Sequence, residues 1–419
     1  MGHSIARTRG FVNRSGIDDF SCSFSGKHLY YTTTIMKQRI AFLYLNTGGG
    51  HVAPARALAR GLEESYSDTA EPLLVNGFNE KMRLCRYFFE NGYQVSSNYF
   101  EAGYVLFYRM TEYPAAIRFG NYFVSIHGVR NLMRMLREHR ITKVVCIHEI
   151  LILMAREAID RVDPSIPLIT MVTDPFTAHA LWFYEKNNDL VVFSEKLRKE
   201  AVERYGHDPA RVHHFPFILS RSFDRPYTAD EIAAAKERLG IPPDRKILLV
   251  AGGGEGLKSA DRIVAAFLRR KRSDYLIVVC GRNKILRMQV STMVDLKRAK
   301  NVRVYGFVPF MADLLNCADC IITKGGASTV MEVLSVGKPV IFSTFIRGQE
   351  LGNVLFAIHN GAGLYIKKPR EILDQASRIL DNPDVAETMH RNALRLKIRN
   401  GLDEVLAFIH SFKLTGQQP

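Results

Sequence analysis

The stretch TKGGASTVMEVLSVGKPVIFSTFIRGQELGN, residues 323–353, holds a strand end, a glycine turn, a helix start and a second strand in close succession. An apolar strand ends at Thr323, and the turn over residues 324–329 leads into a helix that Gly337 closes. Glycines let the backbone approach phosphate oxygens, and a helix start offers free N–H groups and positive potential. The stretch therefore predicts a pyrophosphate-binding turn, although a plain strand-turn-helix corner would show a similar pattern.

Two polar features beyond the turn extend this predicted site. Glu332 lies one helical turn inside, where its carboxylate can accept hydrogen bonds from two ribose hydroxyls. After the strand at residues 339–342, the loop at residues 347–350 returns amide and carboxylate groups to the same end of the sheet. Open α/β sheets bind ligands at that end. The stretch therefore predicts a site for a nucleotide sugar.

The composition describes a globular protein with an anionic partner. The 419 residues are too many for one ordinary core, which favours two domains. Hydrophobic residues make up 47% and charged residues 24%, which excludes a disordered chain. The net charge of +15 fits nucleic acid, an anionic membrane surface or a phosphate-bearing substrate. Because the sequence contains no recognised nucleic-acid motif, we expect no nucleic acid partner.

The six cysteines indicate neither a disulfide framework nor a zinc site. They are scattered, and the pair Cys317 and Cys320 runs directly into an apolar strand without a second pair of ligands. We expect these two thiols to pack in the core, and we expect no bound metal and no cofactor. No apolar run reaches the roughly 18 residues that span a bilayer, so any contact with a membrane would be made from its surface.

Two further glycine corners accompany the opening stretch. The strand at residues 40–45 leads into a glycine run and His51, and the strand at residues 246–251 leads into a glycine run at 252–256. Neither corner has the spacing of a dinucleotide fingerprint or a P-loop. His51 stands at a helix entrance, where it is either a general base or a structural histidine.

Polar residues also close two other predicted strands. The strand at residues 143–147 ends in His148-Glu149, and the strand at residues 168–172 is followed by Asp174 and His179. Because the ends of parallel strands share one edge of a sheet, these side chains are expected to gather there. Asp174 and His179 are candidate site residues, although either could cap the next element instead.

The segment at residues 81–137 is rich in aromatic rings and cations. Aromatic residues crowd the region up to Phe123, and Arg130, Arg134 and Arg137 are expected on one helix face. Rings and cations both favour the interface between lipid headgroups and water. The segment therefore predicts contact with an anionic membrane surface, and the alternative is that most of these rings form core.

Strands alternate with helices in both halves of the chain, which indicates two Rossmann-like domains whose parallel sheets face each other across a cleft. Residues 1–35 lack sustained periodicity and are expected to be disordered or a non-native extension. The expected domains are residues 36–218 and residues 219–399. A helix at about residues 400–415 is expected to pack back on the first domain.

The pairing of NTGGGH at residues 46–51 with TKGGAST and GQELGN resembles the GT-B glycosyltransferases of the group that holds monogalactosyldiacylglycerol synthase, processive diacylglycerol glucosyltransferase and MurG. AGGGEG, VVCGRN, NVRVYGFV and ADCIITKGG follow in the expected order. Where the group has a THP-like element, this chain has Ile147-His148-Glu149. The first glycine corner continues as Val52-Ala53-Pro54, which is closer to MurG.

The resemblance implies an inverting, metal-independent transfer of a hexose from a UDP-sugar to a lipid hydroxyl. His51 or Asp174 would be the catalytic base, and His179 would join Gly49 and Gly50 on the acceptor side. The donor-binding residues would be Gly253, Gly254, Arg282, Phe307, Gly325, Gly326, Ala327, Ser328, Thr329, Glu332, Gln349, Glu350 and Asn353.

The resemblance leaves the acceptor open between diacylglycerol, a related glycolipid and a polyprenyl-linked lipid. A UDP-sugar epimerase shares the expected architecture and is the alternative enzyme class. For a transferase of this kind we expect a cytoplasmic enzyme that lies on the inner face of the cell membrane.

Overall fold

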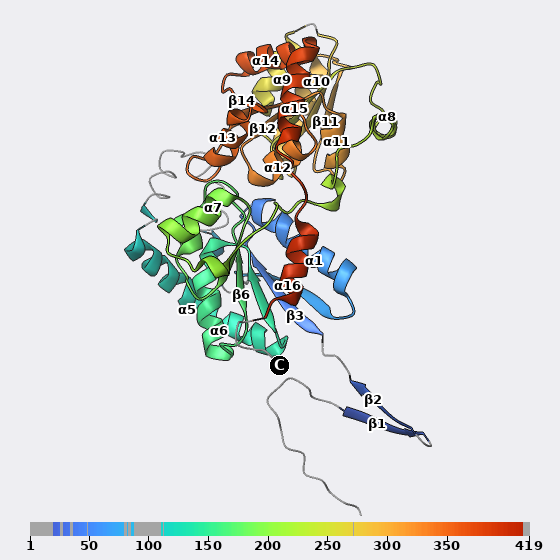
Figure 1. Ribbon diagram of the computed structural model, residues 1–419. Coiled ribbons are helices and arrows are strands. Elements are labelled where there is room, and N and C mark those ends of the chain that lie inside the picture. The colour runs from blue at the N-terminus through green and yellow to red at the C-terminus, as the bar shows by residue number, and fades with distance from the viewer. Residues whose placement is uncertain are drawn as a thin grey trace, which may run out of the picture.

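The computed structural model describes residues 20–25, 28–33, 37–47, 49–78, 82, 85–87, 110–111, 113–270 and 272–413. Two six-stranded parallel sheets, each with helices on its faces, lie one above the other in Figure 1. We call the first sheet with its helices the N-terminal unit and the second the C-terminal unit. The expected fold class, an α/β protein with two Rossmann-like parallel sheets, is confirmed.

The N-terminal unit is built on strands whose central members are buried on both faces. Parallel strands of this kind are apolar throughout, as in β5, where every residue is buried. The strands are β3 (Gln38–Tyr44), β4 (Ala70–Asn76), β5 (Lys143–Cys146), β6 (Leu168–Met171), β7 (Asp189–Val192) and β8 (Val212–His214). The α-helices are α1 (Gly49–Tyr66), α5 (Pro114–Glu138), α6 (Ile152–Val162) and α7 (Glu195–Lys199).

The C-terminal unit repeats this plan. Its strands are β9 (Ile247–Ala251), β10 (Tyr275–Val279), β11 (Val302–Tyr305), β12 (Cys320–Lys324), β13 (Val340–Thr344) and β14 (Gly363–Tyr365). Its helices are α8 (Ala229–Arg238), α9 (Ala260–Leu268), α10 (Lys284–Leu296), α11 (Met311–Cys317), α12 (Ala327–Ser335), α13 (Leu351–His359), α14 (Pro369–Asp381) and α15 (Pro383–Arg395). Cys317 and Cys320 are free and buried, as expected of core residues.

Each sheet has one place where the chain reverses its direction of travel across the strands. The N-terminal sheet has the order β4-β3-β5-β6-β7-β8, and the reversal lies between β3 and β5. The C-terminal sheet has the order β11-β10-β9-β12-β13-β14, and the reversal lies between β9 and β12. Ligands of open α/β sheets bind beyond the carboxyl ends of the strands at such switch points. All three glycine corners of the sequence fall at these two places.

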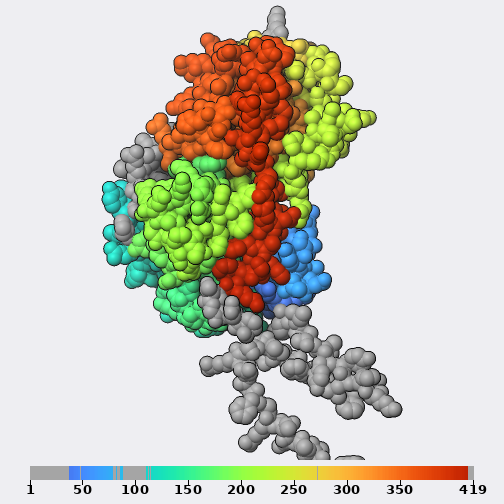
Figure 2. Space-filling view, in the orientation of Figure 1, coloured from blue at the N-terminus to red at the C-terminus, as the bar shows by residue number. Residues whose placement is uncertain are grey.

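The two units share a hydrophobic contact, and the end of the chain ties them together. One core cluster contains residues from both sheets, among them Phe42 and Phe342. After α15 the chain returns to the N-terminal unit as α16 (Leu402–Ser411), which lies along α1 in Figures 1 and 2. At Gly61 a Cβ would lie 2.6 Å from Leu406 Cδ1, so the helices approach more closely than a side chain would allow.

Strands β1 (Phe20–Ser25) and β2 (His28–Thr33) form a separate antiparallel pair. In the part of the chain that the structure describes, no helix is both long and apolar enough to cross a membrane. Much of the aromatic segment at residues 81–137 lies outside the described residues. Its described part is mainly α5, on which Phe119, Tyr122 and Ile126 are exposed.

Candidate functional site

The predicted phosphate-binding turn joins β12 to α12 at the C-terminal switch point. Gly325 is enclosed, because a Cβ there would lie 2.6 Å from Val354 Cγ2 and 2.8 Å from Phe345 Cβ. Asn353 Nδ2 donates to the Gly325 carbonyl oxygen at 2.9 Å and so braces the turn from behind. α12 begins at Ala327, and the hydroxyl oxygen of Ser328 is buried without a hydrogen-bond partner. The turn thus presents the start of a helix and a free hydroxyl, which suits a phosphate group.

A lysine that the sequence analysis did not assign to the site stands beside this turn. Lys324 Nζ lies 3.1 Å from Glu350 Oε1. The Cε atom of the Lys324 side chain lies near both Gly326 and Gly253. The other carboxylate oxygen of Glu350 accepts the backbone N–H of Ile346 at 2.9 Å. Lys324 therefore places a positive charge between two glycine corners. Its position directly before the glycine turn was the available signal.

The nucleoside end of the predicted donor site combines two further features. The Arg282 guanidinium lies 4.9 Å from the ring centre of Phe307, whose side chain is exposed, and Arg282 Nη1 would lie 3.1 Å from a Cβ on Gly254. Gly253 has a φ of 72°, a conformation that favours glycine. Burial raises the pKa of Glu332 to about 8, so this carboxyl holds a proton at neutral pH.

His51 occupies the first turn of α1 at the N-terminal switch point and is buried. Its Nδ1 lies 3.0 Å from the Ile147 carbonyl oxygen and 3.1 Å from Thr173 Oγ1. Because a carbonyl oxygen can only accept a hydrogen bond, Nδ1 carries the ring hydrogen and Nε2 carries the lone pair. Burial, followed by the nearby His148, lowers the pKa of His51 to about 4, which keeps the imidazole neutral. A neutral ring with a free lone pair can accept a proton.

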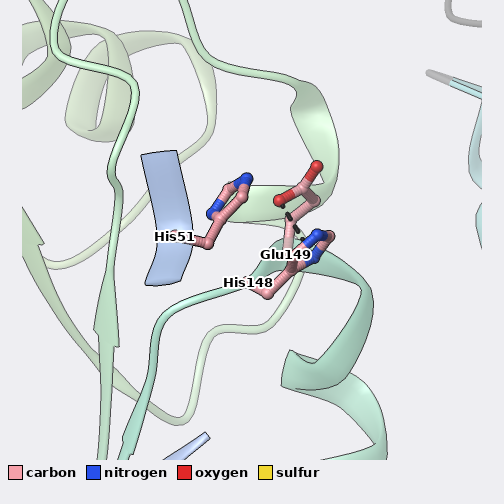
Figure 3. A group of neighbouring side chains, drawn as sticks. All are labelled: His51, His148 and Glu149. Atoms are coloured by element: carbon pink, nitrogen blue, oxygen red, sulfur yellow. Dashed lines mark ion pairs between the residues drawn. The ribbon is translucent and has the colours of Figure 1, made fainter. Parts of the chain in front are cut away.

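His148 and Glu149 follow β5 and lie next to His51 (Figure 3). The centres of the two imidazole rings are 4.3 Å apart. His148 Nδ1 accepts the N–H of Ile150 at 3.3 Å, so His148 Nε2 carries the ring hydrogen and donates it to Thr47 Oγ1 at 2.9 Å. Burial lowers the pKa of His148 to about 3. Glu149 Oε2 lies 3.3 Å from His148 Nδ1 and is buried without a hydrogen-bond partner.

Asp174 connects the two units by hydrogen bonds. Gln349 Nε2 donates to Asp174 Oδ1 at 3.3 Å, and Trp182 Nε1 donates to Oδ2 at 3.3 Å. Burial, followed by the charge of Glu149, raises the pKa of Asp174 well above its usual range. Burial thus favours the protonated form of this carboxyl, whereas the hydrogen bonds from Gln349 and Trp182 favour its charged form.

The loop after Asp174 is seated against the start of α13. The rings of Phe176 and Phe356 stack with centres 4.0 Å apart. At Gly352 a Cβ would lie 2.1 Å from Thr177 Oγ1, so glycine is required for this approach. The contact fixes the loop after Asp174 to the start of α13, which directly follows Gln349 and Glu350.

The remaining predicted residues are placed less centrally. A Cβ on Gly49 or Gly50 would meet no described atom within 4 Å, so the space beside the start of α1 is open. His179 accepts the N–H of Leu181 and starts the short 3₁₀ helix at Ala180–Phe183, which is a capping role. Trp182, which stacks near His51 with ring centres 6.2 Å apart, was missed by the sequence analysis. The sequence marked this residue in one way, because it is the single tryptophan among the 419 residues.

The comparisons with known proteins agree with this arrangement. The family described as "Monogalactosyldiacylglycerol (MGDG) synthase" matches residues 51–215, and the "Glycosyltransferase family 28 C-terminal domain" matches residues 247–405. A probable monogalactosyldiacylglycerol synthase 2 of Oryza sativa subsp. indica is 28% identical over 403 residues, which cover 92% of this chain and 82% of the relative. A processive diacylglycerol beta-glucosyltransferase of Bacillus licheniformis is 25% identical and covers 89% of this chain and 94% of its own.

Solved structures show the same architecture. MurG of Acinetobacter baumannii superposes on this chain with a TM-score of 0.58 at 17% identity. The superposition covers 90% of this chain and 100% of the MurG chain. At that identity the likeness speaks for the fold. The two family matches, which cover the two units in order, and the relatives above show that the chain belongs to the glycosyltransferases of the family 28 and monogalactosyldiacylglycerol synthase group, and the structural likeness shows the GT-B fold.

Proposed function

We propose that this glycosyltransferase moves a hexose from a UDP-sugar to the hydroxyl of diacylglycerol or a related glycolipid at a membrane surface. The observation that carries the proposal is the fixed tautomer of His51, which leaves Nε2 without a hydrogen at the N-terminal switch point. Relatives of similar length act on diacylglycerol by their names, which supports this acceptor.

In this proposal His51 is the general base. Its Nε2 takes the proton of the acceptor hydroxyl while the acceptor oxygen forms a bond to the anomeric carbon of the sugar. The bond between that carbon and the diphosphate breaks, and its electron pair leaves with UDP. Attack from the face opposite the leaving group inverts the anomeric configuration.

The leaving UDP gains negative charge that the C-terminal unit is suited to receive. The N–H groups at the start of α12 point positive potential at the phosphates, and Lys324 adds a full charge beside them. Glu332 would hold the ribose hydroxyls, and the Arg282 and Phe307 pair would cover the base. Gln349 would meet the sugar, since it reaches from the donor unit to Asp174.

The acceptor reaches this site from a membrane in our proposal, and α5 supports that route. Phe119 and Tyr122 are 75% and 66% exposed, and Ile126 continues the same apolar row one turn further. Arg130 and Arg134 follow on that face, exposed toward the end of the helix. Exposed rings beside cations favour a surface of anionic lipid. A protein of this kind lies on the cytoplasmic face of the cell membrane as a peripheral enzyme.

The test is an assay of the purified protein with UDP-glucose or UDP-galactose and vesicles that contain diacylglycerol and an anionic phospholipid. We expect a glycolipid product whose yield depends on the vesicles. Interconversion of free UDP-sugars without vesicles would instead identify an epimerase. Product formed only from a polyprenyl-linked lipid would keep the reaction and replace the acceptor. Absence of any glycolipid product would refute the proposal.

A further inference from the structure

Three lone pairs converge at the N-terminal switch point. The ligand atoms that His51, His148 and Glu149 offer all lie within 4.8 Å of one another. The hydrogen bonds described above leave His51 Nε2 and His148 Nδ1 without hydrogens, and Glu149 Oε2 is a carboxylate acceptor. The lone pair of His148 Nδ1 accepts the Ile150 N–H at 3.3 Å, so a metal at this nitrogen would replace that hydrogen bond. Figure 3 shows the carboxylate of Glu149 extending between the two rings.

This arrangement is electrostatically incomplete. Glu149 Oε2 is buried and has no hydrogen-bond partner, and the nearest polar atom, His148 Nδ1 at 3.3 Å, is itself an acceptor. A buried acceptor without a donor costs about 1–3 kcal/mol. Convergent acceptors in a buried site are stabilised by a positive charge placed among them.

The outer contacts of both rings are those of metal-binding histidines. A ligating histidine generally donates its other ring N–H to a carbonyl, a carboxylate or a similar oxygen, which fixes the tautomer and the ring orientation. His51 does so to the Ile147 carbonyl oxygen, and His148 does so to Thr47 Oγ1. These bonds are present in addition to the convergence of the three inner atoms.

We propose that His51, His148 and Glu149 form a binding site for a divalent transition metal of the Zn²⁺ class. Two imidazole nitrogens and one carboxylate oxygen are a ligand set that Zn²⁺ takes, with a fourth position left for water. The nitrogen ligands disfavour Mg²⁺ and Ca²⁺, which prefer oxygen.

The metal would act as a reversible inhibitor of sugar transfer, a consequence that rests on the proposed function. Binding occupies His51 Nε2, and that lone pair is the one the acceptor proton requires. Donor binding takes place at the other switch point, so UDP affinity is expected to be unchanged by the metal. Removal of the metal by a chelator returns the lone pair and the activity.

The binding test uses the full chain and needs no substrate. Metal-free protein is titrated with Co²⁺ and followed by its visible absorption, and with Zn²⁺ and followed by calorimetry. We expect one site in the unaltered protein, and at least a tenfold loss of affinity in Glu149→Gln and in His148→Gln. The matched control is His359→Gln, which removes an exposed histidine at the end of α13 and should bind as the unaltered protein does.

Folding of each variant is checked by circular dichroism and denaturant unfolding, because UDP affinity reports only on the other unit. Equal Zn²⁺ affinity in the unaltered protein and Glu149→Gln, or no Co²⁺ absorption from a nitrogen-ligated site, would overturn the metal site. Zn²⁺ that binds without lowering transfer activity would overturn the inhibitory role. An inactive protein that still shows the site would leave the metal proposal standing and count against the transfer reaction alone.

Discussion

The two switch points have the same architecture and opposite chemistry. At each, two neighbouring parallel strands end side by side, and a glycine-containing corner leads from at least one of them into a helix. The C-terminal switch point gathers hydrogen-bond donors and positive charge, namely the N–H groups of α12 and the ammonium group of Lys324. The N-terminal switch point gathers acceptors, namely the lone pairs of His51, His148 and Glu149.

The difference shows how one fold can serve both partners of a transfer reaction. The sheet fixes where the strands end, and the few residues after each strand decide the sign of the local potential. Hydrogen-bond donors stabilise a departing diphosphate, and hydrogen-bond acceptors can take the proton that an incoming hydroxyl must lose. The contrast predicts that substitutions at the two places have separable effects on turnover and on UDP affinity.

The largest expected effect comes from His51→Ala. Removal of a general base lowers the rate of transfer by about 10² to 10⁴-fold, while UDP affinity should stay within about twofold. Asp174→Asn is the comparison, because it replaces the other candidate base with a neutral group of the same shape that cannot take a proton. Initial rates with vesicles decide between the two. A large loss in Asp174→Asn with a small loss in His51→Ala would assign the base to Asp174 instead.

Lys324→Met tests the donor-rich switch point. A lost charge-assisted hydrogen bond of about 1.5–3 kcal/mol corresponds to roughly a 10- to 100-fold weaker affinity for UDP. Uridine lacks the phosphates, so its affinity should not change. Calorimetry with both ligands separates the two cases, and Lys368→Met, which breaks the surface pair with Glu371, is the matched control. Equal losses for uridine and UDP would show that Lys324 supports the fold of the site and not the phosphates.

The sequence predicts the central strands well because burial on both faces makes them continuously apolar. Within the two parallel sheets, the strands that the sequence did not predict are β4, β8 and β14, and all three lie at sheet edges. β4 contains Pro72 and is only partly buried, and β8 and β14 have three residues each. Edge strands need less apolar sequence and tolerate proline, so their pattern is weak.

The site was predictable where one local motif carries it. The turn before α12 is such a motif: it lies between β12 and α12 as the pattern predicts, and Asn353 donates to the Gly325 carbonyl oxygen, whereas its binding of phosphate stays a prediction. The partners of His51 come from Ile147 and Thr173, which are remote in sequence, so no local pattern reveals its tautomer. The link between Gln349 and Asp174 was equally hidden, because it depends on how the two units pack.

The pH dependence of nucleoside binding tests Glu332. Burial holds its pKa at about 8 in the unliganded protein, whereas the proposed ribose contact uses the carboxylate. Binding must then release a proton below pH 8, so uridine affinity rises with pH by up to about tenfold per unit and levels off above pH 8. Calorimetry between pH 6.5 and 8.5 measures the slope. Glu332→Gln should bind weakly at every pH, and a flat profile in the unaltered protein would exclude a carboxylate contact with ribose.

The smallest expected effects distinguish the glycines of the two corners. Gly325→Ala places a Cβ against Val354 and Phe345, which should lower stability by about 1–3 kcal/mol. Gly50→Ala meets no described atom within 4 Å, and because alanine favours a helix, stability should rise by about 0.5 kcal/mol. Denaturant unfolding measures both. If Gly50→Ala is fully stable and its transfer rate nevertheless falls, the open space beside His51 is needed by a substrate; an unchanged rate would show that no substrate approaches the start of α1.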